Sequence, residues 1–123
     1  MTKEQFKDRT KRLALNVISL VEELPRNRTC DVLGRQLLRS GTSVGANYRA
    51  ACRARSAVEM AAKLGIVEEE ADESQYWLEL LVDSGQVGFE KVEPLNSELD
   101  EILAMTVTSI RTVRARSGKR TSA

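Results

Sequence analysis

Hydrophobic residues recur along the chain in four blocks, which short polar segments separate. Within each block the apolar residues follow one another at steps of three, four or seven, which places them on one face of a helix. Because the connections are short, consecutive helices are expected to be antiparallel neighbours. The predicted fold class is all-α, an up-down-up-down antiparallel four-helix bundle. Its helices are expected at about residues 3–24, 29–55, 57–84 and 94–115.

Residues with known preferences for helix ends set these boundaries. Pro25 ends the first helix, because the residue before a proline resists helical geometry. Thr29 is the expected N-cap of the second helix. Ser56 and Glu59 have the spacing of a capping box, so the third helix begins almost directly after the second. Pro94 marks the expected start of the fourth helix.

The second predicted helix carries small residues where a helix usually carries bulky ones. Its central sequence, from Leu37 to Ser56, is LLRSGTSVGANYRAACRARS. Gly41 and Gly45 each destabilise a helix by about 1 kcal/mol relative to alanine, and the close approach of a neighbouring helix is the simplest compensation. Asn47 flanks the core face of this helix and is a candidate for setting the register between helices.

Arginines form a stripe on the opposite side of the same helix. The stripe runs from Arg35 to Arg53 and would be about 27 Å long. Guanidinium groups bind phosphate bidentately, which predicts a nucleic-acid surface. The alternative is that these arginines pair with acids of the third helix or of another subunit. The predicted nucleic-acid-binding residues are Arg35, Arg39, Arg49, Arg53, Arg55, Arg114, Arg116, Lys119 and Arg120.

The charge is strongly segregated along the 123-residue chain, although its net value is only +1. Residues 1–63 hold 13 Lys/Arg against 6 Asp/Glu, and residues 64–110 hold 1 against 12. The last segment, 111–123, holds 5 basic residues and no acid. This segregation favours pairing between helices or subunits and leaves basic surface for an anionic partner. We expect one bundle domain over residues 1–116 and a basic, disordered tail over 117–123.

The composition argues against an enzyme or a metalloprotein. The chain has no histidine, which removes the commonest general base and the histidine ligands of di-iron bundles. The acids of 68–73 suit a solvated or arginine-paired face better than a magnesium or calcium site. No catalytic residue, metal or cofactor is therefore expected. Cys30 and Cys52 are expected to be free thiols in a cytoplasmic protein, with neither a signal peptide nor a membrane-spanning run.

A second apolar set lies on the far side of the third helix, beside two glutamates. A tryptophan placed there indicates a subunit interface. The alternative, a tryptophan covered by the fourth helix or its connection, stays open. The predicted interface residues are Ile66, Glu70, Glu73, Trp77 and Leu80.

The stretch from Leu37 to Ser56, followed by KLGIVEEEADESQYWLELL, resembles the four-helix bundle family of 23S rRNA intervening-sequence proteins. The resemblance extends from about Phe6 to Val113. It implies an up-down-up-down bundle that assembles as a homopentamer, and it brings no catalytic residues. A related branch is the accessory protein of diversity-generating retroelements, which binds nucleic acid and a reverse transcriptase.

Two hypotheses of different kinds follow for the function. In the first, the protein is a non-enzymatic oligomeric bundle, a pentamer by resemblance, that binds RNA or DNA non-specifically through its basic helix faces. In the second, it is a protein-interaction scaffold or an accessory subunit, for example of a reverse transcriptase, whose arginines are used in subunit contacts.

Overall fold

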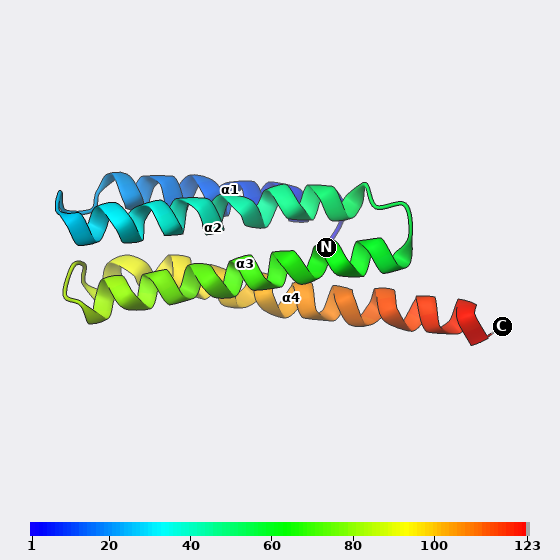
Figure 1. The fold of residues 1–123 in the computed structure, drawn as a ribbon. Helices are drawn as coiled ribbons and strands as arrows, with labels where there is room; N and C mark the ends of the chain where they lie inside the picture. The colour runs from blue at the N-terminus through cyan, green and yellow to red at the C-terminus, as the bar shows by residue number, and fades with distance from the viewer. Residues whose placement is uncertain (123) are drawn as a thin grey trace.

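Four antiparallel helices form the molecule in the computed structural model, which describes residues 1–122 and their side chains through Gly118. Figure 1 shows α1 and α2 as one layer above α3 and α4, each helix running opposite to the next. The predicted four-helix bundle is confirmed, and the described residues contain no strand. The helices are α1 (Lys3–Glu22), α2 (Arg28–Cys52), α3 (Ala57–Asp83) and α4 (Phe89–Ser122).

The ends of the first three helices are fixed by side chains that accept hydrogen bonds from the free backbone N–H groups of the first turn. Ser56 caps α3 as predicted, accepting from the Glu59 backbone N–H at 3.0 Å. The N-cap of α2 is Asn27 and not Thr29, because the Asn27 side chain accepts from the Cys30 N–H at 2.8 Å. Thr2 caps α1 in a capping box that the sequence analysis did not identify.

Helix α4 is longer at both ends than predicted. It begins at Phe89, with Pro94 inside the helix, and continues through Ser122 in place of ending near residue 115. Val92 is buried beside Leu95 and Leu99, and burial of this apolar face favours helix before the proline. The predicted tail therefore begins within continuous helix, and Ala123 lies outside the described residues.

Small residues of α2 lie directly against α1, as their composition predicted. A Cβ atom added to Gly41 would lie 2.8 Å from Val17 Cγ2, and one added to Gly45 would lie 3.2 Å from Thr10 Oγ1. Gly34 in the same way faces Val21 of α1 and Leu24, which directly follows the end of that helix. The close approach of the two backbones explains why glycine is present despite its cost in a helix.

The polar contact between helices in the core is made by serines. Ser74 of α3 donates a hydrogen bond to Ser40 Oγ of α2 at 2.8 Å, and both side chains are fully buried. Asn47 instead donates to the Ser43 carbonyl of its own helix at 2.9 Å. Within the chain no hydrogen bond from the described Asn47 side chain to another helix is present, so the register between α2 and α3 is marked by the serine pair, and a role of Asn47 across a subunit interface stays a prediction.

The two ends of the bundle differ because α1, with 20 residues, is shorter than the other helices. The N-terminus of α1 lies short of the connection between α2 and α3, and the last turns of α4 extend beyond that connection (Figure 1). We call this part of the molecule, beyond the start of α1, the open end. The opposite end, at the α1–α2 and α3–α4 connections, is the closed end.

Candidate nucleic-acid interface

The structure divides the predicted arginine stripe into paired and unpaired residues. Arg39 donates to Glu70 at 3.4 Å and to Glu73, although its side chain is 52% exposed. The hydrogen bonds and negative charges of Glu73 and Glu70 raise the pKa of Arg39. Arg39 therefore follows the alternative stated from the sequence, in which arginines of the stripe pair with acids of the third helix. Arg35, Arg49 and Arg53 are exposed and make no ion pair within the described part of the chain.

The predicted subunit face lies along the seam between α3 and α2. Two of its members, Glu70 and Glu73, form ion pairs with Arg39 of the same chain. Trp77 is half-buried and packs against the core, with the exposed Tyr76 ring at a centroid distance of 5.2 Å. The Trp77 indole N–H is buried without a hydrogen-bond partner among the described residues. Ile66 and Leu80, the other predicted members, are also half-buried.

Arginines from three distant segments of the chain meet at the open end. Helices α2 and α4 run in the same direction, so their C-terminal turns lie at the same end of the bundle (Figure 1). The short connection from α2 to α3 adds another arginine there. All of these side chains are exposed, and none makes an ion pair within the described residues. We call this cluster the basic end: Arg49, Arg53, Arg55, Arg111, Arg114 and Arg116.

Two other predicted residues fall outside what the structure describes. The side chains of Lys119 and Arg120 lie beyond the last described side chain, so their positions are not part of the basic end as defined. Arg35 lies far along α2 from Arg53, about 27 Å at helical rise, and is a separate cation near the closed end.

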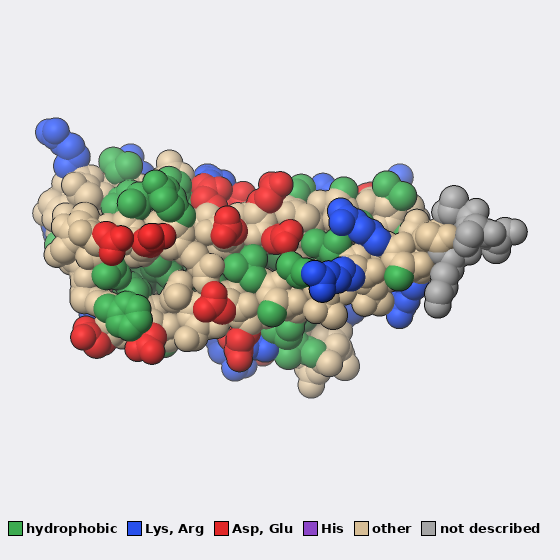
Figure 2. All heavy atoms as spheres, turned by 90° about the horizontal axis from the view of Figure 1, so that it is seen from below, with side chains coloured by type: hydrophobic (Ala, Val, Ile, Leu, Met, Phe, Trp, Pro, Cys, Tyr) green, Lys and Arg blue, Asp and Glu red, His purple; other side chains and the backbone are tan. Residues whose placement is uncertain are grey.

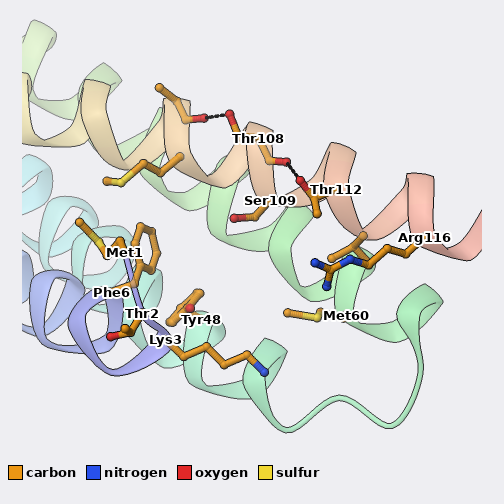
Figure 3. A pocket seen from close by; sticks show the side chains of 13 residues that line it. Met1, Thr2, Lys3, Phe6, Tyr48, Met60, Thr108, Ser109, Thr112 and Arg116 are labelled. Atoms are coloured by element: carbon orange, nitrogen blue, oxygen red, sulfur yellow. Dashed lines mark hydrogen bonds between the residues drawn. The ribbon is translucent and has the colours of Figure 1, made fainter.

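A hollow of about 510 Å³ opens beside the basic end, between the N-terminus of α1 and α4. In Figure 3 the side chains of Lys3 and Arg116 extend toward it from these two helices. No carboxylate is among its lining residues. We call this space the basic hollow. Its apolar floor includes Phe6, Tyr48, Met60 and Met105.

The floor of the basic hollow is neutral and rigid. The rings of Phe6 and Tyr48 lie with centroids 4.4 Å apart, and both side chains are buried. Burial, together with the adjacent Cys52 thiol, raises the pKa of Tyr48, so its hydroxyl stays protonated at neutral pH. The hollow therefore combines an uncharged apolar floor with a cationic rim.

A second hollow of about 290 Å³ lies beside the first. It is lined by Arg55 and shares Met60, Val113 and Arg116 with the basic hollow. Its lining also contains no carboxylate. The two hollows are thus neighbours on either side of Met60, Val113 and Arg116 at the open end.

One side of the closed end has the opposite charge. A hollow of about 360 Å³ there is lined by Glu79, Asp83 and Asp100 beside the exposed ring of Phe89, with no lysine or arginine. Figure 2, which views the α3–α4 side, shows acidic side chains from the closed end to the middle and basic ones toward the open end, with a further basic side chain projecting at the closed-end corner. The α3–α4 side of the closed end is therefore acidic, whereas its α1–α2 side carries the exposed Arg26, Arg28 and Arg35.

The described residues offer no other candidate chemistry of the kinds weighed from sequence. No group of three or more cysteines, aspartates and glutamates among them is arranged to hold a metal ion. Cys30 and Cys52 are free thiols, as predicted. None of the described helices has the length and apolar character needed to cross a membrane.

The family model for the 23S rRNA-intervening sequence protein matches residues 3–108, nearly the whole of the bundle. The chain belongs to this family. The predicted resemblance is therefore confirmed, and it covers every element that builds the core.

A solved structure supports membership of the 23S rRNA-intervening sequence family at the level of the whole fold. It is a protein with unknown function from the S23 ribosomal protein family of Bacteroides thetaiotaomicron VPI-5482, and it shares 35% sequence identity with this chain. The match covers 90% of this chain and 99% of that one, with a TM-score of 0.84. A comparison with curated proteins gives no match.

Sequence reasoning missed three features of this member of the 23S rRNA-intervening sequence family. Lys3 and Arg111 belong to the cationic surface of the open end, and neither was predicted. The basic hollow itself was also missed. The available signal was that the predicted first helix, about 3–24, is shorter than the second and third, about 29–55 and 57–84, because a shorter helix must leave part of its neighbours uncovered.

Proposed function

We propose that this protein is a non-enzymatic, oligomeric bundle that binds the phosphate backbone of RNA or DNA through its basic end. The observation that supports this most is the gathering of six exposed arginines at the open end, none of which makes an ion pair within the described residues. Arg26, Arg28 and Arg35 near the closed end are also exposed and unpaired, but they are fewer and lie among acids such as Glu22 and Asp31. Cations in excess over the carboxylates around them create a positive potential that attracts polyanions.

Phosphate contacts of this kind position a nucleic acid but do not read its sequence. Binding is therefore expected to be strongly salt-dependent and nearly indifferent to sequence, because it releases condensed counterions. A homopentamer, as the family resemblance implies, would present five copies of the basic end. Multiple weak sites on one assembly increase the overall affinity without any new contact. We place this function in the cytoplasm.

The proposal is tested by binding of labelled single- and double-stranded RNA and DNA across a salt series. A variant with Arg49, Arg53, Arg114 and Arg116 changed to glutamine should bind at least tenfold more weakly at low salt, with a shallower dependence on salt. The charge-matched control changes four other exposed arginines to glutamine: Arg12, Arg26, Arg28 and Arg35.

The control variant has the same net charge as the basic-end variant but keeps the cluster intact. It should therefore retain most of the affinity. Absence of binding by the unaltered protein at low salt would refute the proposal. Equal losses in the two variants would show that net charge alone, and not the basic end, attracts the nucleic acid.

A protein-interaction scaffold, or an accessory subunit of an enzyme such as a reverse transcriptase, is the second candidate. It is favoured by the pairing of Arg39 with α3 and by the opposite charges of the basic end and of the α3–α4 side of the closed end. In this case Arg49→Glu together with Arg53→Glu should dissociate the oligomer, as measured by light scattering. Retention of the full assembly size would count against this use of the two arginines.

A further inference from the structure

We propose that the basic hollow receives one unpaired nucleotide of a single-stranded nucleic acid. The base would lie on the apolar floor, and its phosphate would lie between Lys3 and Arg116 on the rim. This inference rests on the proposed function and specifies the form of nucleic acid that the open end prefers. A strand of unpaired nucleotides is favoured over a duplex, whose bases are stacked and inaccessible.

The size and floor of the basic hollow fit a flat aromatic ring. Its volume of about 510 Å³ leaves ample room for one nucleobase. Phe6 and Tyr48 are buried and expose only small parts of their rings toward the hollow, so the apolar surface that a base would contact comes mainly from the half-buried side chains of Met60 and Met105, which are adaptable and polarizable. Contact between nucleobases and aromatic or apolar side chains favours single strands and is tolerant of sequence, because every base has a π-face.

The polar groups of the hollow favour an anionic ligand that also offers hydrogen-bond donors. Lys3 and Arg116 supply cations on opposite sides, from α1 and α4 (Figure 3). The hydroxyls of Thr108 and Thr112 donate to carbonyls of their own helix at 3.0 Å each, which leaves their oxygen lone pairs to accept from a base amino group. A carboxylate, which would repel phosphate, is absent from the lining.

The adjoining hollow gives the rest of the strand a path. Because Arg116 lines both hollows, a phosphate bound there would connect a nucleotide in the basic hollow to the next one beside Arg55. Lone apolar grooves usually bind protein segments, but these two hollows have Lys3, Arg55 and Arg116 on their rims and no carboxylate in their linings. The complementary charge is that of a phosphodiester backbone.

The decisive probes are two labelled strands of equal length and charge, one of single-stranded DNA and one built from abasic sugar–phosphate units. Both meet the same basic end, so a difference in affinity measures the contribution of the bases. We expect the strand with bases to bind about tenfold more tightly, as fluorescence anisotropy would show. A hairpin duplex with the same total number of phosphates, measured at the same salt, should bind no more tightly than the abasic strand.

A variant in which a large side chain fills the basic hollow tests whether the bases bind there. Ser109→Trp places a large side chain in the basic hollow without changing the charge, and it should reduce binding of the base-bearing strand to the abasic level. Ser97→Trp, at an exposed position of α4 outside this hollow, is the control and should leave both affinities unchanged. Because the abasic comparison needs only the unaltered protein, the inference stays testable even if Ser109→Trp does not fold.

The outcomes separate this inference from the proposed function. Equal binding of base-bearing and abasic strands, or tighter binding of the duplex, would overturn the inference and leave phosphate binding intact. Absence of binding by any of these probes at low salt would refute both. A free mononucleotide that competes as well as a strand would show a nucleotide pocket unrelated to strand binding, and would also overturn it.

Discussion

The closed and open ends of the bundle use their charges in different ways. At the closed end and along the middle, cations bridge helices: Arg9 of α1 contacts Glu98 and Glu101 of α4, and Lys91 contacts Glu23 at 2.7 Å. At the open end no ion pair joins two helices within the described residues, whereas near the closed end the exposed and unpaired Arg26, Arg28 and Arg35 lie beside such a bridge. Ion pairs that join helices stabilise the fold, whereas unpaired cations add repulsion and remain available to a ligand.

From this difference we expect the stability of the fold and the binding of polyanions to depend on separate parts of one small molecule. The first helix packs closely against α2 toward the closed end and is absent beyond its N-terminus at the open end (Figure 1). Substitutions in the closely packed part should therefore change the free energy of unfolding. Substitutions at the basic end should instead change affinity for polyanions.

The largest effect on stability is expected where α1 and α2 approach most closely. Gly41→Ala should reduce the free energy of unfolding by about 2 kcal/mol, because the added Cβ lies 2.8 Å from a methyl of the buried, branched Val17. The higher helix propensity of alanine offsets only part of this overpacking. Urea denaturation at fixed protein concentration is the measurement.

Gly65→Ala is the matched control for this prediction. Gly65 is also in a helix interior, but nothing lies within 4 Å of the Cβ that alanine would add. The variant should gain up to about 1 kcal/mol from helix propensity alone. A gain at both glycines would show that the contact between α1 and α2 is looser than the structure describes.

The next effect concerns the bridge between α1 and α4. Arg9 donates from Nε to Glu98 Oε2 at 2.7 Å and from Nη2 to Glu98 Oε1 at 2.6 Å, and both side chains are about one quarter exposed. Arg9→Gln should cost about 1 kcal/mol in the free energy of unfolding, since this partly buried pair is bidentate. Arg12→Gln breaks only the exposed pair with Asp8 and should change stability by less than about 0.5 kcal/mol.

The same bridge predicts a dependence on pH. Hydrogen bonding from Arg9 lowers the pKa of Glu98 below its ordinary value of 4.5. A carboxyl group with a lowered folded-state pKa stabilises the protein above its unfolded pKa, and this contribution is lost as pH falls through the folded pKa. The stability difference between the unaltered protein and Arg9→Gln should therefore shrink below pH 4.5. A difference that stays constant on acidification would show that Arg9 acts through packing alone.

The architecture could be predicted because periodicity and helix caps are local properties of the sequence. Gly41 and Gly45 also indicated close packing correctly, since glycine in a helix interior needs a compensating contact. The start of α4 was misplaced because Pro94 was read as a boundary. Burial of Val92 against the core favours a helix that already begins before that proline.

The charged surface was less predictable because it depends on how distant segments meet. The period of α2 placed its arginines outward, but the pairing of Arg39 with Glu73 requires the register between α2 and α3. That register includes the Ser40–Ser74 hydrogen bond, which no sequence pattern marked. Likewise, Arg53 and Arg116 share one end only because α2 and α4 run in the same direction.

The smallest effect on stability is expected at the basic end. Arg49 and Arg53 are four residues apart at the C-terminal end of α2, where their mutual repulsion is opposed by the favourable interaction of each cation with the helix dipole. Because these contributions have opposite signs, Arg49→Gln together with Arg53→Gln should change the free energy of unfolding by less than about 0.5 kcal/mol while weakening phosphate binding.

High salt distinguishes effects of surface charge from structural contacts. Screening reduces the interaction between exposed charges, so any stability difference of the double variant should disappear at high ionic strength. A loss of about 1 kcal/mol or more at any salt concentration would show instead that these arginines make structural contacts, as they would in a subunit interface. A large loss of binding with little change in stability would mean that these charges serve a ligand and not the fold.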